Sequence, residues 1–224
     1  MVRTNRQHHV RIFIAILLCL GYAGTAVAVA DGGFISGTAA DAGTGDPAAD
    51  LRIRIYDAEW NFMYSESAWT AADGGYTTGE LDPGNYYVRA VSLYPQPWVT
   101  QYWFGTTDPD TAIPVQVSAG ETIIGIDFSL DRGGYIRGAI RDTGSHPLVD
   151  LDLDVYSSDW TYYGGYTDRT GESGDYILGP LPAGKWYVRA DPDPVHGVCQ
   201  AYWPDGWYRE EAQVLAVTAG GDIP

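Results

Sequence analysis

The feature that most constrains this chain is an internal repeat with a period of about 100 residues. The segment GYTTGELDPGNYYVRA at 75–90 returns as DYILGPLPAGKWYVRA at 175–190. Other positions agree at the same offset without gaps, among them Pro47 and Pro147, Trp60 and Trp160, and Thr70 and Thr170. Agreement over so many positions predicts two tandem copies of one fold, at residues 32–131 and 133–224.

Hydrophobic alternation identifies the class of this fold. Short alternating runs are separated by Gly, Pro, Asp and Asn, a pattern typical of an all-β sandwich or barrel. In the run LRIRIY at 51–56, apolar residues alternate with Arg52 and Arg54, as expected of a strand with one buried face. Each copy of the 16-residue segment predicts a strand, a tight turn and a second strand.

The first 30 residues have the pattern of a secretory signal peptide. Three arginines precede an apolar run at 12–20, and small residues suited to signal peptidase follow at 26–30. We therefore expect secretion, with no membrane insertion after cleavage. Loss of these arginines leaves 10 basic against 29 acidic residues, a net charge of −19, which makes nucleic acid a poor partner. Cys199 then remains without a partner for an internal disulfide.

Four motifs of the first copy, with counterparts in the second, resemble the carboxypeptidase regulatory-like family: Ile35-x-Gly37, Pro47 before the run 51–55, Thr70-x-x-Asp73-Gly74-x-Tyr76, and Leu81-x-Pro83-Gly84-x-Tyr86-x-Val88. The resemblance implies two extracellular transthyretin-like, Ig-like antiparallel β-sandwiches of about seven strands each. It also implies a likeness in shape to carbohydrate-binding sandwiches and bacterial surface repeats, and it implies no catalysis. The chain departs from the family at Ala71 and Gly171, where the family tends to have aspartate.

The second copy stops before its last strand. The turn at 119–120 of the first copy leads to a closing strand at 123–130, whereas the equivalent turn at 219–220 lies four residues before Pro224. Two explanations are open. The sequence is a piece of a longer protein with further repeats or domains, or a strand from another chain completes the second sandwich.

Aromatic residues in the least regular segments are the candidate ligand-binding residues. Loops at the end of a sandwich often carry binding, and sugars stack their apolar faces on such rings. The candidates are Trp98, Tyr102 and Trp103 in the first copy and Tyr202, Trp203 and Trp207 in the second. Alternatively these rings close the ends of the two cores, because Tyr102-Trp103 recurs at the repeat offset.

The run DLDLD at 150–154 is the one place where carboxylates align. Asp150, Asp152 and Asp154 lie on one strand face, where oxygen ligands could serve Ca²⁺. Alternation favours leucines in the core and aspartates in water, spread by about 6.6 to 7 Å, so we expect no metal site. The first copy has Arg52 and Arg54 at two of these positions, which makes the two faces complementary for contact between neighbouring chains.

We expect the chain to have no enzymatic activity. Cys199 lies three residues from His196, but proximity in sequence does not make a nucleophile and base. The expected function is a non-enzymatic secreted or cell-surface module that acts as spacer and binding platform in an adhesin-like protein, with a surface glycan or a protein as partner. One alternative is a carbohydrate-binding module that uses the loop aromatics. The other is an accessory domain of a larger secreted peptidase or hydrolase.

Overall fold

The computed structural model describes residues 31–163, 169–191, 197 and 199–224. The expected signal segment 1–30 and His196 lie outside the described residues. Among the described residues, the regular elements are β-strands apart from two one-turn 3-10 helices, η1 (Pro109–Thr111) and η2 (Arg209–Glu211). The all-β fold expected from the alternation is therefore confirmed.

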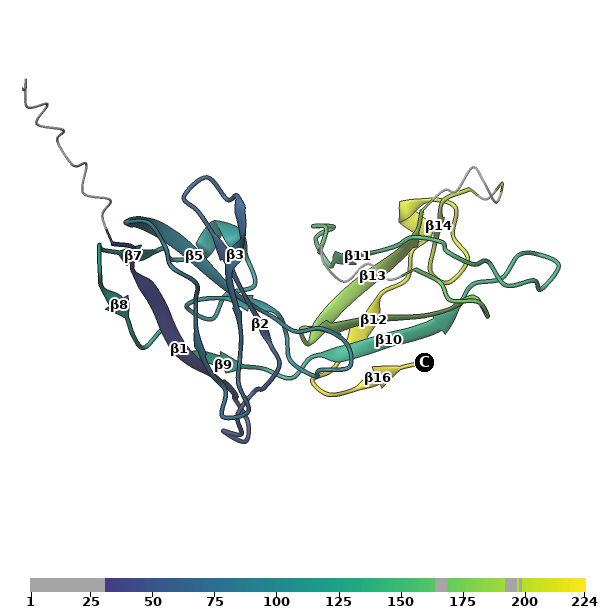
Figure 1. Ribbon diagram of the computed structural model, residues 1–224. Coiled ribbons are helices and arrows are strands. Elements are labelled where there is room, and N and C mark those ends of the chain that lie inside the picture. Colours follow the sequence, from purple (N-terminus) through teal and green to yellow (C-terminus); the bar gives the residue numbers. More distant parts are fainter. Residues whose placement is uncertain (1–30, 164–168, 192–196, 198) are drawn as a thin grey trace, which may run out of the picture.

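The first sandwich holds two sheets, drawn in purple to teal in Figure 1. One sheet joins β4 (Gly75–Thr77), β1 (Phe34–Asp41), β8 (Thr122–Ile123) and β9 (Phe128–Leu130). The other joins β3 (Phe62–Trp69), β2 (Arg52–Tyr56), β5 (Gly84–Val91), β6 (Gln101–Tyr102) and β7 (Val115–Val117).

The second sandwich repeats this plan, in green to yellow in Figure 1. One sheet has the order β12 (Asp175–Leu181), β10 (Gly134–Ala139) and β16 (Asp222–Ile223). The other joins β11 (Leu153–Ser157), β13 (Gly184–Ala190), β14 (Ala201–Tyr202) and β15 (Leu215–Val217).

Each sandwich has its own hydrophobic core between its sheets. Leu51, Ile53 and Ile55 are fully buried in the first core, as the alternation of this run predicts. A buried threonine then ties the strands to the loops: the hydroxyl of Thr70 accepts a hydrogen bond from the Leu51 amide and donates one to the carbonyl of Ala48. The hydroxyl of the equivalent residue, Thr170, makes the same two bonds in the second sandwich.

The closing strands differ from the expectation in two respects. β8 and β9 pair with β1 in parallel, so this sheet is mixed rather than antiparallel throughout. The single closing strand expected at 123–130 is also two short strands, because Gly125, with a φ of 80°, turns the chain between them. In the second sandwich β16 is the counterpart of β8, and within the described residues no strand corresponds to β3 or to β9.

A buried aspartate fastens the connection between the sandwiches to the first of them. Asp41 accepts hydrogen bonds from the indole Nε1 of Trp98 at 3.1 Å and from Nε of Arg132 at 2.7 Å. Burial acts to raise the pKa of Asp41, but these bonds and those from two backbone amides hold it below its ordinary value. Across the connection, the hydroxyl of Tyr135 donates to the carbonyl of Gln96 at 2.7 Å.

Candidate binding face

The outer face of β2 and β5 in the first sandwich carries a cluster of basic and aromatic side chains. Arg54 on β2 lies directly opposite Arg89 on β5, and Tyr56 lies opposite Tyr87. These residues alternate with the fully or nearly fully buried residues of the same strands, so they point away from the core. Arg52, two residues before Arg54, lies on the same face.

Aromatic rings from β3 and from the turn before it surround these arginines. Trp60 adopts a φ of 65°, in the left-handed region, and stacks on Tyr87 with ring centroids 4.1 Å apart and planes 9° apart. The guanidinium of Arg52 lies 4.6 Å from the centroid of the Tyr64 ring, and that of Arg54 lies 5.3 Å from the Phe62 ring. We call this set the arginine–aromatic face; its members are Arg52, Arg54, Tyr56, Trp60, Phe62, Tyr64, Trp69, Tyr87, Arg89 and Tyr102.

The three arginines of this face have no acidic partner. Arg52, Arg54 and Arg89 make no ion pair with any described residue. Their Nε atoms are buried without a hydrogen-bond partner. The face is nevertheless open to solvent, since Tyr64 is 71% exposed and Trp69 is 54% exposed. In a chain of net charge −16, a cluster of cations without counter-charge is suited to an anionic ligand.

The second sandwich keeps the aromatic stack and replaces the basic cluster. Trp160 stacks on Tyr187 at 4.2 Å and 9°, again with a left-handed φ of 66°. Asp152 and Asp154 stand where the first sandwich has Arg52 and Arg54, while Arg189 corresponds to Arg89. The aromatic stack is thus common to the two sandwiches, and the charge of the face is not.

The aspartates considered for Ca²⁺ are bound by arginines. Asp150 and Asp152 pair with Arg169 at 2.8 and 2.9 Å, and Asp154 pairs with Arg189. The expectation that all three lie in water is wrong for Asp154, which is 8% exposed because Arg189 covers it. The described residues contain no group of three His, Cys, Asp or Glu side chains placed to hold a metal ion.

A second carboxylate contacts the arginine that pairs with Asp154. Asp191 lies 2.6 Å from Nη2 of Arg189, which also binds Asp154. Burial raises the pKa of Asp191, the charge of Asp154 raises it further, and Arg189 opposes both effects without cancelling them. The acidic face is therefore internally compensated, in contrast to the basic one.

The six loop aromatics predicted as ligand-binding residues occupy different environments. Tyr102 and Tyr202 are buried, and Trp98, Trp103 and Trp203 pack partly buried against the cores. Trp207 is 65% exposed. Tyr102 also borders the arginine–aromatic face, where its ring lies 5.0 Å from the Arg89 guanidinium and edge-on to Trp60. Ligand binding by the six residues remains a prediction.

The aromatic residues of β3 were not predicted as part of a binding surface. Phe62, Tyr64 and Trp69 follow no strict alternation, and their nearness to Arg52 depends on strand pairing. The recurrence of Trp60 as Trp160 was a usable signal for part of the face.

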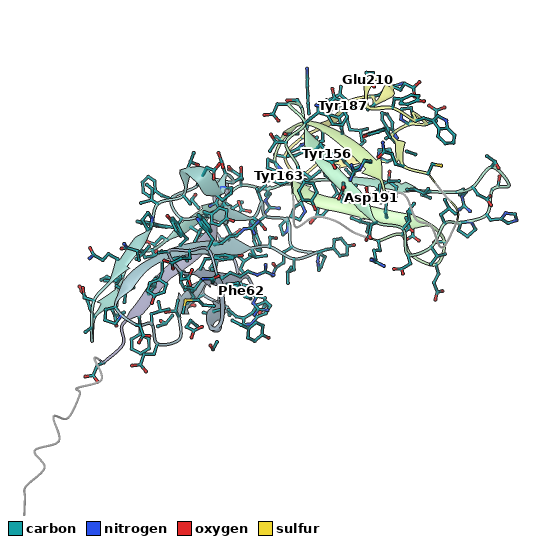
Figure 2. All side chains as sticks on the ribbon, turned by 90° about the horizontal axis from the view of Figure 1, so that it is seen from above. Phe62, Tyr156, Tyr163, Tyr187, Asp191 and Glu210 are labelled. Atoms are coloured by element: carbon teal, nitrogen blue, oxygen red, sulfur yellow. The ribbon has the colours of Figure 1, made fainter. Side chains whose placement is uncertain are left out.

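A cleft of about 910 Å³ between the sandwiches extends the face. Arg89 and Tyr102 line it from the first sandwich, and Tyr162, Tyr163 and Trp186 line it from the second. Figure 2 shows the side chains of both sandwiches, with Phe62 labelled on the first and Tyr163 on the second. Asp108, Asp110 and Asp159 also line this cleft, so it places carboxylates as well as rings beside the arginine–aromatic face.

Comparison with known proteins finds distant structural likeness. No family model and no curated protein sequence matches the chain. Among solved structures, the Bacillus anthracis TIE protein is 15% identical with a TM-score of 0.37, over 86% of this chain and 33% of that one. The minor pilin GBS52 of Streptococcus agalactiae is 13% identical with a TM-score of 0.37, over 85% and 92%. A streptococcal ancillary pilin is 14% identical with a TM-score of 0.33, over 83% and 62%.

The chain thus spans about a third of the length of the first of these proteins. None of the helices in the described part of the chain is long and apolar enough to cross a membrane.

Proposed function

We propose that the chain is a non-enzymatic module of a secreted or cell-surface protein, in which two sandwiches of the carboxypeptidase regulatory-like kind act as spacer and binding platform. The arginine–aromatic face is its binding surface, and its ligand is an acidic polysaccharide. The observation that carries this proposal is the set of three arginines without acidic partners, surrounded by exposed rings.

Two kinds of contact favour an acidic polysaccharide over a neutral one. Guanidinium groups bind carboxylate or sulfate oxygens through charge-assisted hydrogen bonds. Exposed rings such as Tyr64 and Trp69 accept the apolar C–H faces of sugar rings. The rest of the chain is acidic and repels anions at long range, so binding depends on close contact with Arg52, Arg54 and Arg89.

The proposal assigns no catalytic role to the described residues. They hold one histidine, His146, which is exposed and lies 3.1 Å from Asp142. Cys199 is exposed, and His196, three residues before it in the sequence, lies outside the described residues. No catalytic role follows from either residue.

Affinity electrophoresis tests the binding surface. The chain is run through gels that contain polygalacturonate, or neutral dextran as a comparison, at low and high salt. We expect retardation by polygalacturonate that weakens with salt, and at least a tenfold loss of affinity in the double variant R52Q/R54Q, which keeps most of the side-chain stems. Arg169→Gln in the second sandwich is the matched control and should bind as the parent does.

The proposal fails if a folded parent chain is not retarded by polygalacturonate, or if R52Q/R54Q and Arg169→Gln lose affinity equally. Thermal melts of each variant identify a loss that comes from unfolding. Equal retardation by dextran would show that the rings bind sugars without help from the arginines, which also overturns the acidic ligand.

A further inference from the structure

The cleft between the sandwiches is continuous with the arginine–aromatic face but differs from it in charge. Arg89 and Tyr102 are members of the face and also line the cleft. Beyond them the cleft carries three carboxylates. Asp108 and Asp110 come from the start of η1 in the first sandwich, and Asp159 comes from the turn after β11 in the second. A ligand that passes from the face into the cleft therefore leaves a cationic surface and meets an anionic one.

The carboxylates of the cleft have no cation of their own. Asp108, Asp110 and Asp159 make no ion pair with any described residue. Hydrogen bonds, above all the one from the Ser157 hydroxyl, hold the pKa of Asp159 below its ordinary value. Asp108 accepts a hydrogen bond from the amide of Asp110 at 2.9 Å, which fixes its carboxylate at the start of η1. Among the described residues that line the cleft, these three acidic groups stand against one arginine, Arg89.

The other lining groups suit a neutral sugar. Tyr162 is 50% exposed and offers its ring to the apolar C–H face of a sugar. The hydroxyls of Thr107, Ser158 and Thr161 donate or accept hydrogen bonds. Carboxylate oxygens accept hydrogen bonds from sugar hydroxyls, whereas they repel the carboxylate of an acidic sugar. The cleft therefore favours a neutral sugar and opposes an acidic one.

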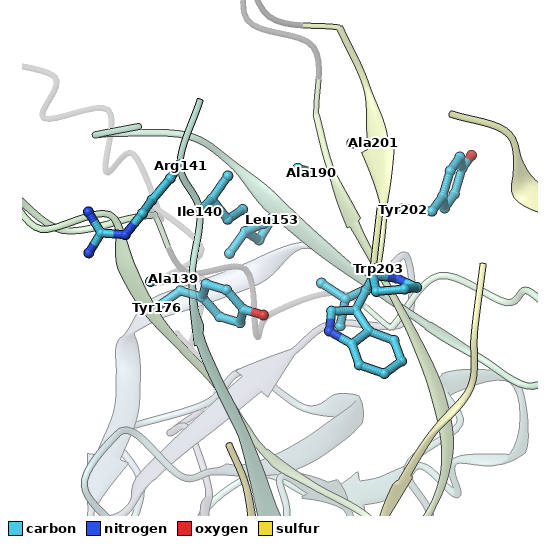
Figure 3. Close-up of a pocket in the computed structure, with 11 residues that line it drawn as sticks. Ala139, Ile140, Arg141, Leu153, Tyr176, Ala190, Ala201, Tyr202 and Trp203 are labelled. Carbon is cyan, nitrogen blue, oxygen red and sulfur yellow. The ribbon is translucent and has the colours of Figure 1, made fainter. Parts of the chain in front are cut away.

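Size also favours this cleft over a smaller cavity within the second sandwich. That cavity has a volume of about 210 Å³ and lies beside Ala139, Ile140 and Leu153 (Figure 3). Sites for small molecules occupy about 300–1,000 Å³, so the cavity is below this range. The cleft of about 910 Å³ is near the top of it and has room for sugar units.

We propose that the cleft selects a neutral sugar next to the acidic sugars held by the arginine–aromatic face, so that the ligand is a polysaccharide in which acidic and neutral sugars alternate. Asp108, Asp110 and Asp159 determine this specificity, because they oppose a further acidic sugar beside Arg89. The inference rests on the proposed function. It adds the charge pattern of the ligand and a contribution from the second sandwich.

Affinity electrophoresis with two acidic polymers tests the selection. Hyaluronan alternates glucuronate with neutral N-acetylglucosamine, whereas every sugar of polygalacturonate is acidic. In the double variant D108N/D110N, asparagine keeps the N-cap of η1 while two charges are removed. We expect its affinity for polygalacturonate to rise at least fivefold, and its affinity for hyaluronan to change less than twofold.

The matched control is D46N/E121Q. It removes two exposed charges of the first sandwich that do not line the cleft. The gels contain about 0.1 M salt, which largely screens exposed charges more than about 10 Å apart. The control should therefore change both affinities less than twofold.

Tyr162→Ala tests the contribution of the second sandwich. The Tyr162 ring is half exposed and lies 5.8 Å from the Tyr156 ring, so we expect the variant to melt as the parent does. Its affinity for hyaluronan should fall at least fivefold, and its affinity for polygalacturonate should change less than twofold. If the variant is unfolded, the comparison of D108N/D110N with its control decides the proposal.

Two results would overturn this inference and leave the proposed function intact, provided that R52Q/R54Q still loses affinity. One is an equal change of polygalacturonate affinity in D108N/D110N and D46N/E121Q. The other is unchanged affinity of folded Tyr162→Ala for hyaluronan. Full affinity of R52Q/R54Q for both polymers, or no retardation of the folded parent by either, refutes the proposed function and this inference with it.

Discussion

Removal of one tyrosine hydroxyl from each sandwich tests the hydrogen bond that Tyr76 makes to a backbone carbonyl and that Tyr176 does not make to a described residue. Tyr76 is 5% exposed and donates to the carbonyl of Ile126, which is itself a buried residue. Tyr76→Phe keeps the ring and leaves this carbonyl without its partner, which costs about 1–3 kcal/mol. Tyr176 has no equivalent bond, so Tyr176→Phe should change the free energy of unfolding by less than about 0.5 kcal/mol.

Urea denaturation measures this difference. With an m-value of about 2 kcal/mol per M, Tyr76→Phe should lower the unfolding midpoint of the first sandwich by about 0.5–1.5 M. Hydrogen exchange of peptides from β1 and β10 assigns each transition to its sandwich. Equal destabilisation by the two substitutions would refute the reasoning, because it would mean that the Tyr176 hydroxyl already has a partner.

Three further substitutions test the interior. Asp41→Asn should lower the melting temperature at pH 7. Hydrogen bonds such as that from Trp98 hold the pKa of Asp41 below 3.8 against the effect of burial, so the ionised form stabilises the fold above pH 3.8. The difference in melting temperature between variant and parent should therefore close as pH falls below 3.8. Thr70→Val should cost about 1–3 kcal/mol in urea unfolding, because two buried backbone groups lose their partner, and Thr70→Ser should not. Asp191→Asn should raise the melting temperature at pH 7, since burial and the charge of Asp154 raise the pKa of Asp191 and disfavour its ionised form. This gain should shrink as pH falls below the raised pKa and disappear below the ordinary pKa of 3.8.

Local pattern predicted the buried side of each strand, and non-local pairing decided what gathers on the outer side. The alternation at 51–56 correctly places Leu51 and Ile53 in the core. It also implies that Arg52 points outward, but only the pairing of β2 with β3 brings Tyr64 over that arginine. A contact between strands follows from the order of strands in the sheet, and alternation within one strand does not determine that order.

The loop aromatics illustrate the same limit. Trp98 was a reasonable candidate for ligand binding because its segment is rich in proline and irregular. Its indole donates to Asp41, which is 57 residues earlier in the chain and buried by the fold itself. Recurrence of Tyr102 as Tyr202 fits the buried environment of both rings, and recurrence alone had left the core role and the ligand role open.

The charge difference between the two outer faces leads to one more prediction, in which stability and binding change in opposite directions. Arg54 lies directly opposite Arg89, an arrangement of like charges that costs about 0.2–1 kcal/mol, whereas the second sandwich pairs Asp154 with Arg189 at the same place. Arg54→Asp copies the second arrangement into the first sandwich. It should raise the urea midpoint and abolish retardation by polygalacturonate, because one cation is lost and a second is neutralised. A variant that is less stable than the parent would show that the basic cluster carries no structural cost, and a variant that still binds would show that the cluster is not the binding surface.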